Sequence, residues 1–217
     1  MPLGFDAPMR LLIATTNPGK IREIKGILAG APVELRTLAE SAGIPEPEET
    51  ETTFAENSRL KALYYATRTG LPAVADDSGI EIDALDGGPG VDSARWLGTD
   101  YAVKFAAIYR SIADRGWRTS PARFVCHLAL ARGDQVLFEA TGTVEGEIAP
   151  EPRGTHGFGY DPIFFYPPYG CTLAEVDGDR KAAVSHRGKA FAQLRRWIIE
   201  RQKTEDRRQK TEEGRQK

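Results

Sequence analysis

The order of the predicted elements changes near residue 115, and this change limits the fold more than any other feature of the chain. Before it, strands expected at 10–15, 33–38, 73–76 and 80–83 alternate with helices expected at 18–29, 54–69 and 100–115. After it, strands follow one another at 124–131, 136–143, 144–149 and 163–166, and a last helix begins at Ser185. This order predicts an α/β fold with a central mixed sheet flanked by helices.

Charge and cysteine content exclude several classes of protein. The net charge of −2 gives no basic excess, so we expect no nucleic-acid partner. No stretch approaches the roughly 18 apolar residues that a membrane-spanning helix needs. The two cysteines, Cys126 and Cys171, have neither metal-ligand nor disulfide spacing. Since the N-terminus also lacks a signal-peptide pattern, the sequence predicts a cytoplasmic protein that does not bind membranes.

The chain length fits one domain. We expect this domain at 9–200, preceded by an extension at 1–8 and followed by a charged tail at 201–217. In the tail, RQKTEDR is followed by RQKTEEG, but the repeat holds no apolar residue and therefore predicts no coiled coil. We interpret the tail as a solvated helical extension.

The first turn of the domain has the features of a phosphate site. Thr15–Lys20 (TTNPGK) lies between a predicted strand and a predicted helix, with Asn17 as the N-cap and Pro18 as the first helical residue. Backbone N–H groups and the helix dipole at such a position favour an anion, and Lys20 adds a positive charge. The segment is not a Walker A loop, so the alternative is an ordinary capped turn.

Two adjacent carboxylates, Asp76 and Asp77, follow a short apolar strand. Neighbouring side chains on a strand point to opposite faces, so we expect different roles for the two. Carboxylates beside a buried strand need a cation, a donor or water, and Mg²⁺ takes one or two carboxylates together with substrate phosphates. Glutamates of the acidic loop at 46–51 could complete such a site. The alternative is that DDSG at 76–79 forms a solvated turn.

Two later segments carry groups that suit a ligand. Residues 154–161 (GTHGFGYD) combine three glycines with Phe158 and Tyr160, either of which can stack on a base. The alternative is a flexible loop with a packed aromatic side chain. Residues 185–189 (SHRGK), with Lys181 just before them, place positive charge at a helix N-terminus, which suits phosphates or a carbonyl acceptor. Ordinary surface charge is the alternative there.

Taken in order, these segments resemble the inosine triphosphate pyrophosphatase family, also called the Ham-type pyrophosphatases. The resemblance spans about Leu11 to Leu194 and is carried by TTNPGK, EETETTFAENSRLKA, ADDSG, GGPGVDSARW, GFGYDPIF and SHRGKA. It implies an elongated α/β fold with two lobes around a substrate cleft, and a homodimer. It also implies Mg²⁺-dependent hydrolysis of ITP, dITP and XTP to the monophosphate and pyrophosphate.

The resemblance further implies a role for each matching residue. Those expected to hold the triphosphate are Thr15, Thr16, Asn17, Pro18, Gly19, Lys20 and Lys61. Those expected around the base are Phe158, Gly159, Tyr160, Asp161, Lys181, His186 and Arg187. Asp77 is the expected catalytic base and metal ligand, with Asp76 beside it as a further candidate metal ligand and Ser78 on the substrate. Glu48 is the expected ligand from the acidic loop and Glu49 its competitor, because Glu51 stands where the family commonly has glycine.

Two other functions fit parts of the pattern. A pyrophosphatase for methylated pyrimidine triphosphates would have a similar architecture, although the SHR segment speaks against it, and a substrate panel would separate the two. A non-catalytic nucleotide sensor would bind triphosphate and signal through the tail, which deletion of 201–217 would test.

Inosine and xanthine carry a 6-oxo acceptor where adenine carries an amino donor, so donors such as Arg187 favour the deaminated bases.

Overall fold

The computed structural model describes residues 9–40 and 43–215, so the extension expected at 1–8 lies outside the described residues. The strands are β1 (Met9–Ile13), β2 (Val33–Thr37), β3 (Ala73–Ile82), β4 (Pro121–Arg132), β5 (Gln135–Ile148), β6 (Phe164–Tyr166) and β7 (Cys171–Thr172). The α-helices are α1 (Pro18–Ile27), α2 (Phe54–Thr69), α3 (Tyr101–Asp114), α4 (Gly178–Val184) and α5 (His186–Arg215). Short 3-10 turns connect several of them.

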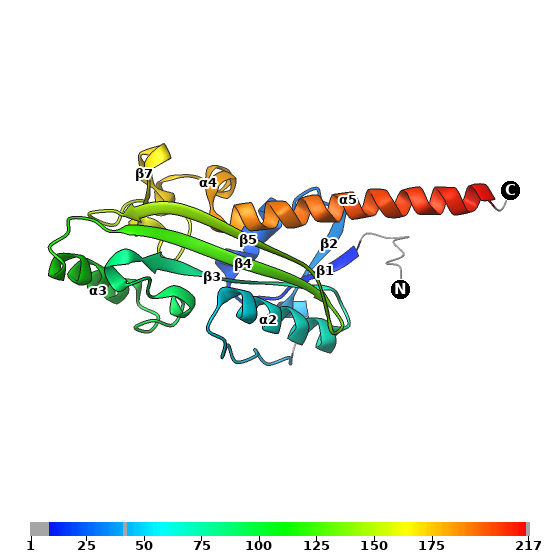
Figure 1. Ribbon diagram of the computed structural model, residues 1–217, viewed down its shortest axis with the longest axis horizontal. Coiled ribbons are helices and arrows are strands. Elements are labelled where there is room, and N and C mark those ends of the chain that lie inside the picture. The colour runs from blue at the N-terminus through cyan, green and yellow to red at the C-terminus, as the bar shows by residue number, and fades with distance from the viewer. Residues whose placement is uncertain (1–8, 41–42, 216–217) are drawn as a thin grey trace.

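All of these strands belong to one mixed sheet, which confirms the predicted α/β class. Its order is β2-β1-β3-β4-β5-β6-β7, with β1 parallel to β2 and β3 and every later pair antiparallel. The long strands β3, β4 and β5 run along the molecule and give it an elongated shape (Figure 1). The parallel part comes from the alternating first half of the sequence, and the antiparallel part from the run of strands that follows.

Capping signals in the sequence set the helix ends near the site. The Asn17 side chain accepts from the N–H groups of Gly19 and Lys20 at the start of α1, and Thr53 accepts from the N–H of Glu56 at the start of α2. Gly70 ends α2 with φ of 68°, a left-handed conformation that glycine adopts at low cost. α2 therefore begins and ends where the sequence predicts, whereas α1 begins at Pro18 as predicted but ends at Ile27, two residues before the predicted end.

Two strands are longer than predicted, and in one of them a glycine explains the error. Residues 76–79 are no turn, because β3 pairs with β4 without interruption from Ala73 to Ile82. The strand predicted at 144–149 is likewise part of β5. A Cβ on Gly79 would lie 2.2 Å from the Gly90 carbonyl oxygen, and one on Gly142 would lie 2.1 Å from that of His186. These glycines allow close backbone approach inside strands instead of forming turns.

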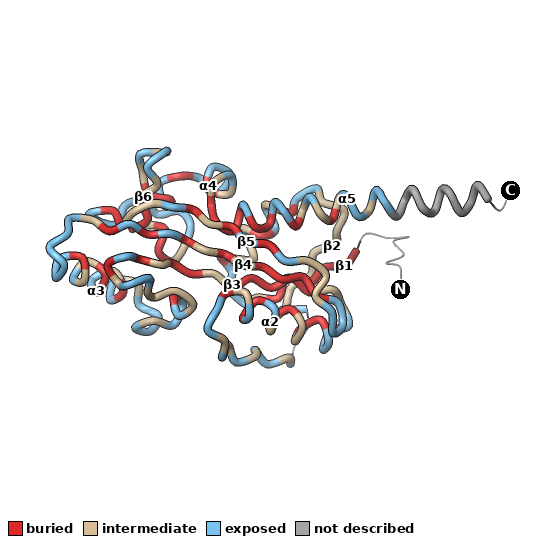
Figure 2. Tube along the Cα trace, viewed as in Figure 1, coloured by how far each residue is buried: buried red, intermediate tan, exposed pale blue. Residues whose placement is uncertain are grey.

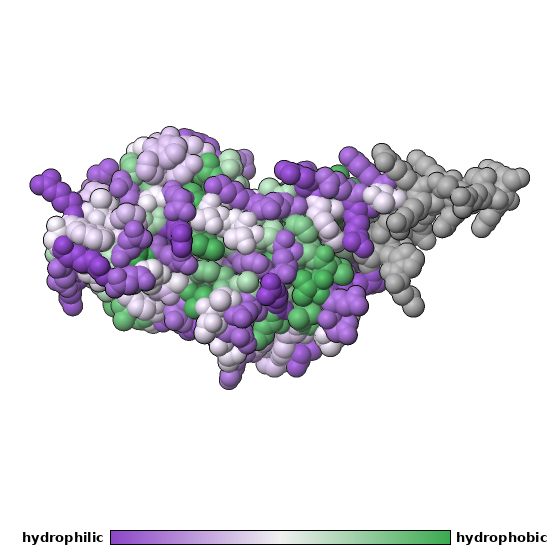
Figure 3. Space-filling model, viewed as in Figure 1, coloured by the Kyte–Doolittle hydropathy of each residue, from purple (hydrophilic) through white to green (hydrophobic). Residues whose placement is uncertain are grey.

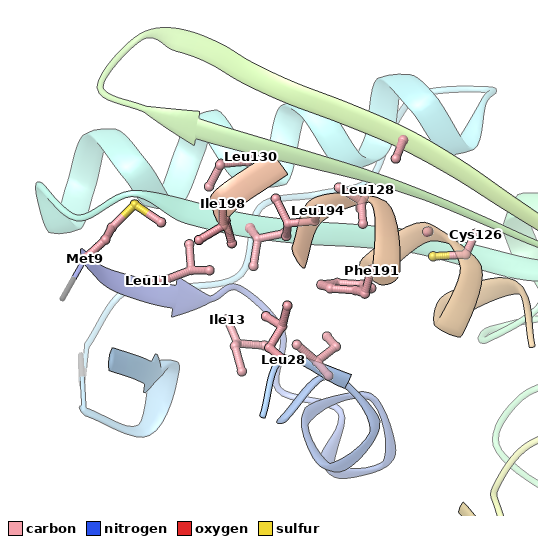
Figure 4. Close-up of a cluster of buried hydrophobic side chains, with 14 residues drawn as sticks. Met9, Leu11, Ile13, Leu28, Cys126, Leu128, Leu130, Phe191, Leu194 and Ile198 are labelled. Carbon is pink, nitrogen blue, oxygen red and sulfur yellow. The ribbon is translucent and has the colours of Figure 1, made fainter. Parts of the chain in front are cut away.

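Opposite faces of the sheet pack against different helices. Val74 of β3 belongs to a cluster with Phe191 and Leu194 of α5, whereas its neighbours Ala73 and Ala75 pack with α2. Figure 4 shows the first cluster, in which side chains of α5 meet those of β1 and β4. Buried residues follow the central strands and the inner sides of these helices (Figure 2). The alternation places Asp76 on the α5 face and Asp77 on the α2 face.

The C-terminal helix α5 extends well beyond its buried part. The buried side chains of α5 within the described part are near its start, and the backbone stays helical to Arg215, as the sequence predicts for the tail. In the face shown in Figure 3, hydrophobic residues are interspersed with hydrophilic ones. Among the described helices, none has a stretch both long and apolar enough to span a bilayer. The helix α4 has no predicted counterpart because its seven residues are too few to show a period.

Candidate active site

One cavity of about 400 Å³ brings most of the predicted site residues together, although they come from separate parts of the sequence. Those that line it are Thr15, Thr16, Asn17, Lys20, Glu49, Lys61, Asp77, Ser78, Phe158, Gly159, Tyr160, Asp161, Lys181, His186 and Arg187. The predicted residues that do not line it are Pro18, Gly19, Glu48 and Asp76. The candidate segments of the sequence therefore share one cavity.

The turn predicted to hold phosphate is capped by its own side chain. Asn17 Oδ1 accepts from the N–H of Gly19 at 2.9 Å and from that of Lys20 at 3.1 Å. Gly19 also lies against the Phe158 ring, since a Cβ there would be 2.6 Å from Phe158 Cδ1. These two N–H groups are thus already satisfied, and the groups of this turn that face the cavity are the side chains of Thr15, Thr16, Asn17 and Lys20.

Asp76 is a buried structural carboxylate on the α5 face. Its Oδ2 accepts from Nε and Nη2 of Arg187 at 3.2 and 3.0 Å and lies 3.1 Å from Lys20 Nζ. Burial alone would raise the pKa of Asp76, but Lys20, Arg187 and Lys61 together hold it well below its ordinary value. Asp76 is therefore ionised, and Arg187 and Lys20 balance its charge. Its Oδ1 has no hydrogen-bond partner among the described residues.

Asp77 lies on the other face and borders the cavity. Lys61 Nζ of α2 donates to its Oδ1 at 3.0 Å, and Asn57 Nδ2 of the same helix donates to its Oδ2 at 3.3 Å. Burial raises the pKa of Asp77 above its ordinary value, against the opposing effect of Lys61 and Lys20. A carboxylate with a raised pKa beside a cavity is a stronger base than an exposed one, so the geometry suits proton abstraction.

The acidic loop presents Glu49 to Asp77, not Glu48. Glu49 Oε1 accepts from Lys61 Nζ at 2.6 Å, so Glu49 and Asp77 share this ammonium group, and its Oε2 lies 3.4 Å from Arg95 Nη1. Glu48 is exposed and does not line the cavity. Glu51 needs no glycine-like conformation, because the described non-glycine residues with left-handed φ are Asp86 and Leu97.

A second charged network closes the other side of the cavity. Lys181 Nζ donates to Glu23 Oε1 at 2.6 Å and to Asp161 Oδ2, and Arg187 donates to Glu23 Oε2 at 2.7 Å and to Ser78 Oγ at 2.6 Å. Counting the bonds to Asp76, four of the five guanidinium N–H groups of Arg187 have partners. Arg187 therefore connects Asp76 and Ser78 of β3 to Glu23 of α1, and within the described part of the chain only one of its N–H groups remains free to donate to a ligand.

His186 is the buried group of this wall with free hydrogen-bonding capacity. Its ring stacks on Phe124 with centroids 4.7 Å apart, and its Nδ1 has no partner within the described chain. Burial, with Arg187 and Lys181 nearby, lowers its pKa well below the ordinary value, so the imidazole is neutral. The neutral ring lines the cavity and carries one donor and one acceptor nitrogen.

Asn57 and Glu23 are residues of the site that the sequence analysis did not single out. Asn57 contacts Asp77, and Glu23 holds both Lys181 and Arg187. Asn57 and Lys61 are four residues apart on a predicted helix, and this spacing on one face could have drawn attention to Asn57. No comparable signal marks Glu23, because its partners are distant in sequence. Of the glutamates expected from the loop at 46–51, Glu46 lines the cavity and accepts from Thr16 Oγ1.

Comparisons with known proteins agree with the predicted family. Residues 11–197 match the Ham1 family. A dITP/XTP pyrophosphatase of Exiguobacterium sp. is 45% identical over 193 residues, covering 88% of this chain and 97% of the relative, and one of Rhodospirillum centenum is 48% identical over 189 residues, covering 85% and 92%. A solved structure of a HAM1 protein from Coxiella burnetii has 39% identity and a TM-score of 0.80, covering 88% of this chain and 99% of that one. The chain belongs to the Ham1 family.

Proposed function

We propose that this protein hydrolyses the deaminated purine nucleotides dITP, XTP and ITP to the monophosphate and pyrophosphate, in a reaction that requires Mg²⁺. The observation that carries the proposal is the single cavity on which the candidate segments of the sequence converge. The relatives named dITP/XTP pyrophosphatase support the choice of substrate. Such an enzyme removes these nucleotides before polymerases use them.

The donor set beside Asp77 fits Mg²⁺. Within the described residues, no three His, Cys, Asp or Glu side chains converge on one point, as a closed metal site would require. Magnesium instead takes one or two carboxylates and completes its shell with water and phosphate oxygens. Asp77 and Glu49 already converge on the cationic Lys61 Nζ, and they are the residues we assign to the metal. When bound, Mg²⁺ would neutralise phosphate oxygens and polarise the phosphoryl group.

The residues that line the cavity have two further roles, which are phosphate binding and proton transfer. Thr15, Lys20 and Lys61 face the cavity and can donate to phosphate oxygens, whose charge grows at the leaving pyrophosphate, and Thr16 can do so once its hydroxyl leaves Glu46. Asp77 accepts the proton of the water that attacks the α phosphorus. Its carboxylate keeps lone pairs free for this step, because Lys61 and Asn57 each occupy one position on a different oxygen.

Recognition of the base is assigned to the wall formed by the 158–161 loop, Lys181 and His186. The Phe158 ring supplies a stacking surface, and Lys181 Nζ lies 4.9 Å from its centroid. Since most N–H groups of Arg187 are engaged, donation to a 6-oxo group falls to Lys181, to the neutral His186 ring and to the one remaining N–H of Arg187. A polar mismatch with adenine in this wall would disfavour ATP.

Pyrophosphate release from dITP, XTP, ITP, GTP and ATP, with Mg²⁺ and with EDTA, tests the proposal. We expect kcat/KM for the deaminated purines to exceed that for GTP and ATP, and we expect EDTA to stop turnover. Equal rates for all five nucleotides would reject the substrate assignment. A cytoplasmic location and a homodimer are part of the proposal through the family resemblance, and mass measurement in solution checks the second.

A further inference from the structure

Asn57 joins the two acidic parts of the site although it does not line the cavity. It is completely buried in the first turns of α2. Its Nδ2 donates to Asp77 Oδ2 at 3.3 Å and to the Glu51 carbonyl at 3.2 Å, while its Oδ1 accepts from the Glu51 N–H at 3.2 Å. One carboxamide thus holds β3 and both backbone groups of one residue in the acidic loop.

The same face of α2 carries a second residue that works in parallel. Lys61 follows Asn57 by four residues and so lies one turn along the same face. Lys61 holds Asp77 Oδ1 and the Glu49 side chain, whereas Asn57 holds Asp77 Oδ2 and the Glu51 backbone. Each carboxylate oxygen of Asp77 therefore has its own donor, and with both donors present the carboxylate plane is fixed.

The helix that carries these two residues is itself fixed at the level of Asp77. Ser58 Oγ of α2 and His127 Nδ1 of β4 are 2.7 Å apart, and His127 is the residue paired with Asp77 in the ladder between β3 and β4. The apolar face of α2 also packs against β3 and β4, so the position of the helix does not depend on this one contact. The three hydrogen bonds of the Asn57 amide therefore connect Asp77 and the acidic loop to a helix that the sheet holds in place.

We propose that Asn57 is a positioning residue that holds the Asp77 carboxylate and the acidic loop in their productive relation. The inference rests on the function proposed above and deepens it. The role needs two donors and an acceptor on a short side chain: aspartate would lack both donors and would repel Asp77, and alanine would lack all three groups. Without Asn57, Lys61 alone would hold Asp77, and Glu49 would depend on the loop's remaining contacts.

Two substitutions with a matched control test this role. We expect Asn57→Ala and Asn57→Leu to lower kcat for dITP by about 10- to 100-fold with KM within about 3-fold, because misplacement by about 1 Å of reacting groups can cost about 100-fold. We also expect calorimetric titration with MgCl₂ alone to show weaker Mg²⁺ binding. Ser58→Ala removes a buried hydrogen bond from the same turn without touching Asp77 or the loop, and we expect near wild-type kcat.

Asn57→Leu keeps most of the side-chain volume, so it separates hydrogen bonding from packing and serves if the alanine variant does not fold. The inference would be overturned by a wild-type kcat in Asn57→Leu or by an equal loss of kcat in Ser58→Ala. It would also be overturned if the Asn57 variants changed only KM, or if both kept the wild-type affinity for Mg²⁺. Inactive wild-type protein on dITP, XTP and ITP would instead reject the proposed function, so the two failures are distinguishable.

Discussion

Asp76 and Asp77 are neighbours on one strand, yet their surroundings are opposite. Asp76 meets three cationic or polar partners on the α5 face, namely Arg187, Lys20 and the Cys126 thiol, and its pKa is lowered. Asp77 borders the cavity on the α2 face, shares Lys61 with Glu49, and its pKa is raised. A single residue step along β3 therefore separates a charge-balanced structural site from one that has excess negative charge and an open side.

The different surroundings of Asp76 and Asp77 suit them to different roles, Asp76 to the stability of the fold and Asp77 to the reaction. Removing one partner from a charge-balanced buried network, such as that of Asp76, Arg187 and Lys20, costs stability because the remaining buried charges are no longer balanced. A carboxylate whose burial is only partly compensated, as at Asp77, can take up a proton or a cation without loss of structure. The two aspartates should therefore respond to the same substitution in opposite ways.

The largest effect is expected for Asp77→Asn. Loss of the base should lower kcat/KM for dITP by about 10²- to 10⁴-fold. The free energy of unfolding should change by less than about 1 kcal/mol, which is roughly 2–4 °C in Tm for a chain of this size, because Asn keeps the shape and burial disfavours the charge it replaces. Steady-state kinetics and thermal unfolding measure both quantities. Turnover at the wild-type rate would show that Asp77 is not the base.

Asp76→Asn should mainly affect stability. It takes a carboxylate away from both Arg187 and Lys20 and leaves Arg187 with Glu23 alone, so we expect a loss of about 3–5 kcal/mol in the free energy of unfolding at pH 7. The folded pKa of Asp76 lies below its unfolded value of 3.8. Its contribution is therefore complete above that value and is lost as the pH falls toward the folded pKa, so the difference between the two proteins should narrow below about pH 4. Urea unfolding at several pH values checks the trend, and a gap that widens on acidification would contradict it.

Local signals made the fold and most of the cavity predictable from the sequence. Asn17 and Thr53 cap helices through side chains three residues or fewer from their targets, and the residue step between Asp76 and Asp77 fixes their faces. The errors in the predicted strands arise where contacts between residues distant in sequence determine the local structure. Gly79 belongs to a segment that resembles a turn in sequence, but it lies inside β3, where Gly90 packs against it from another part of the chain.

The choice between Glu48 and Glu49 as metal ligand stays a prediction for the same reason. The two are adjacent residues in a segment without periodicity, and nothing local distinguishes them. The structure favours Glu49, because Lys61, 12 residues from it in sequence, contacts it through its ammonium group. Long-range ion pairs of this kind, like that between Glu23 and Lys181, leave no pattern in a single sequence.

Glu49→Gln and Glu48→Gln form a matched pair that should give the smallest of these effects. Removing the charge of Glu49 takes one of two carboxylates from the proposed metal site, so kcat/KM for dITP should fall by about 10- to 100-fold, with more Mg²⁺ needed for half-maximal rate. Glu48 is exposed, so its substitution should change kcat/KM by less than about 2-fold. Rates measured across a Mg²⁺ titration compare the two, and a larger loss at Glu48 would restore it as the ligand from the acidic loop.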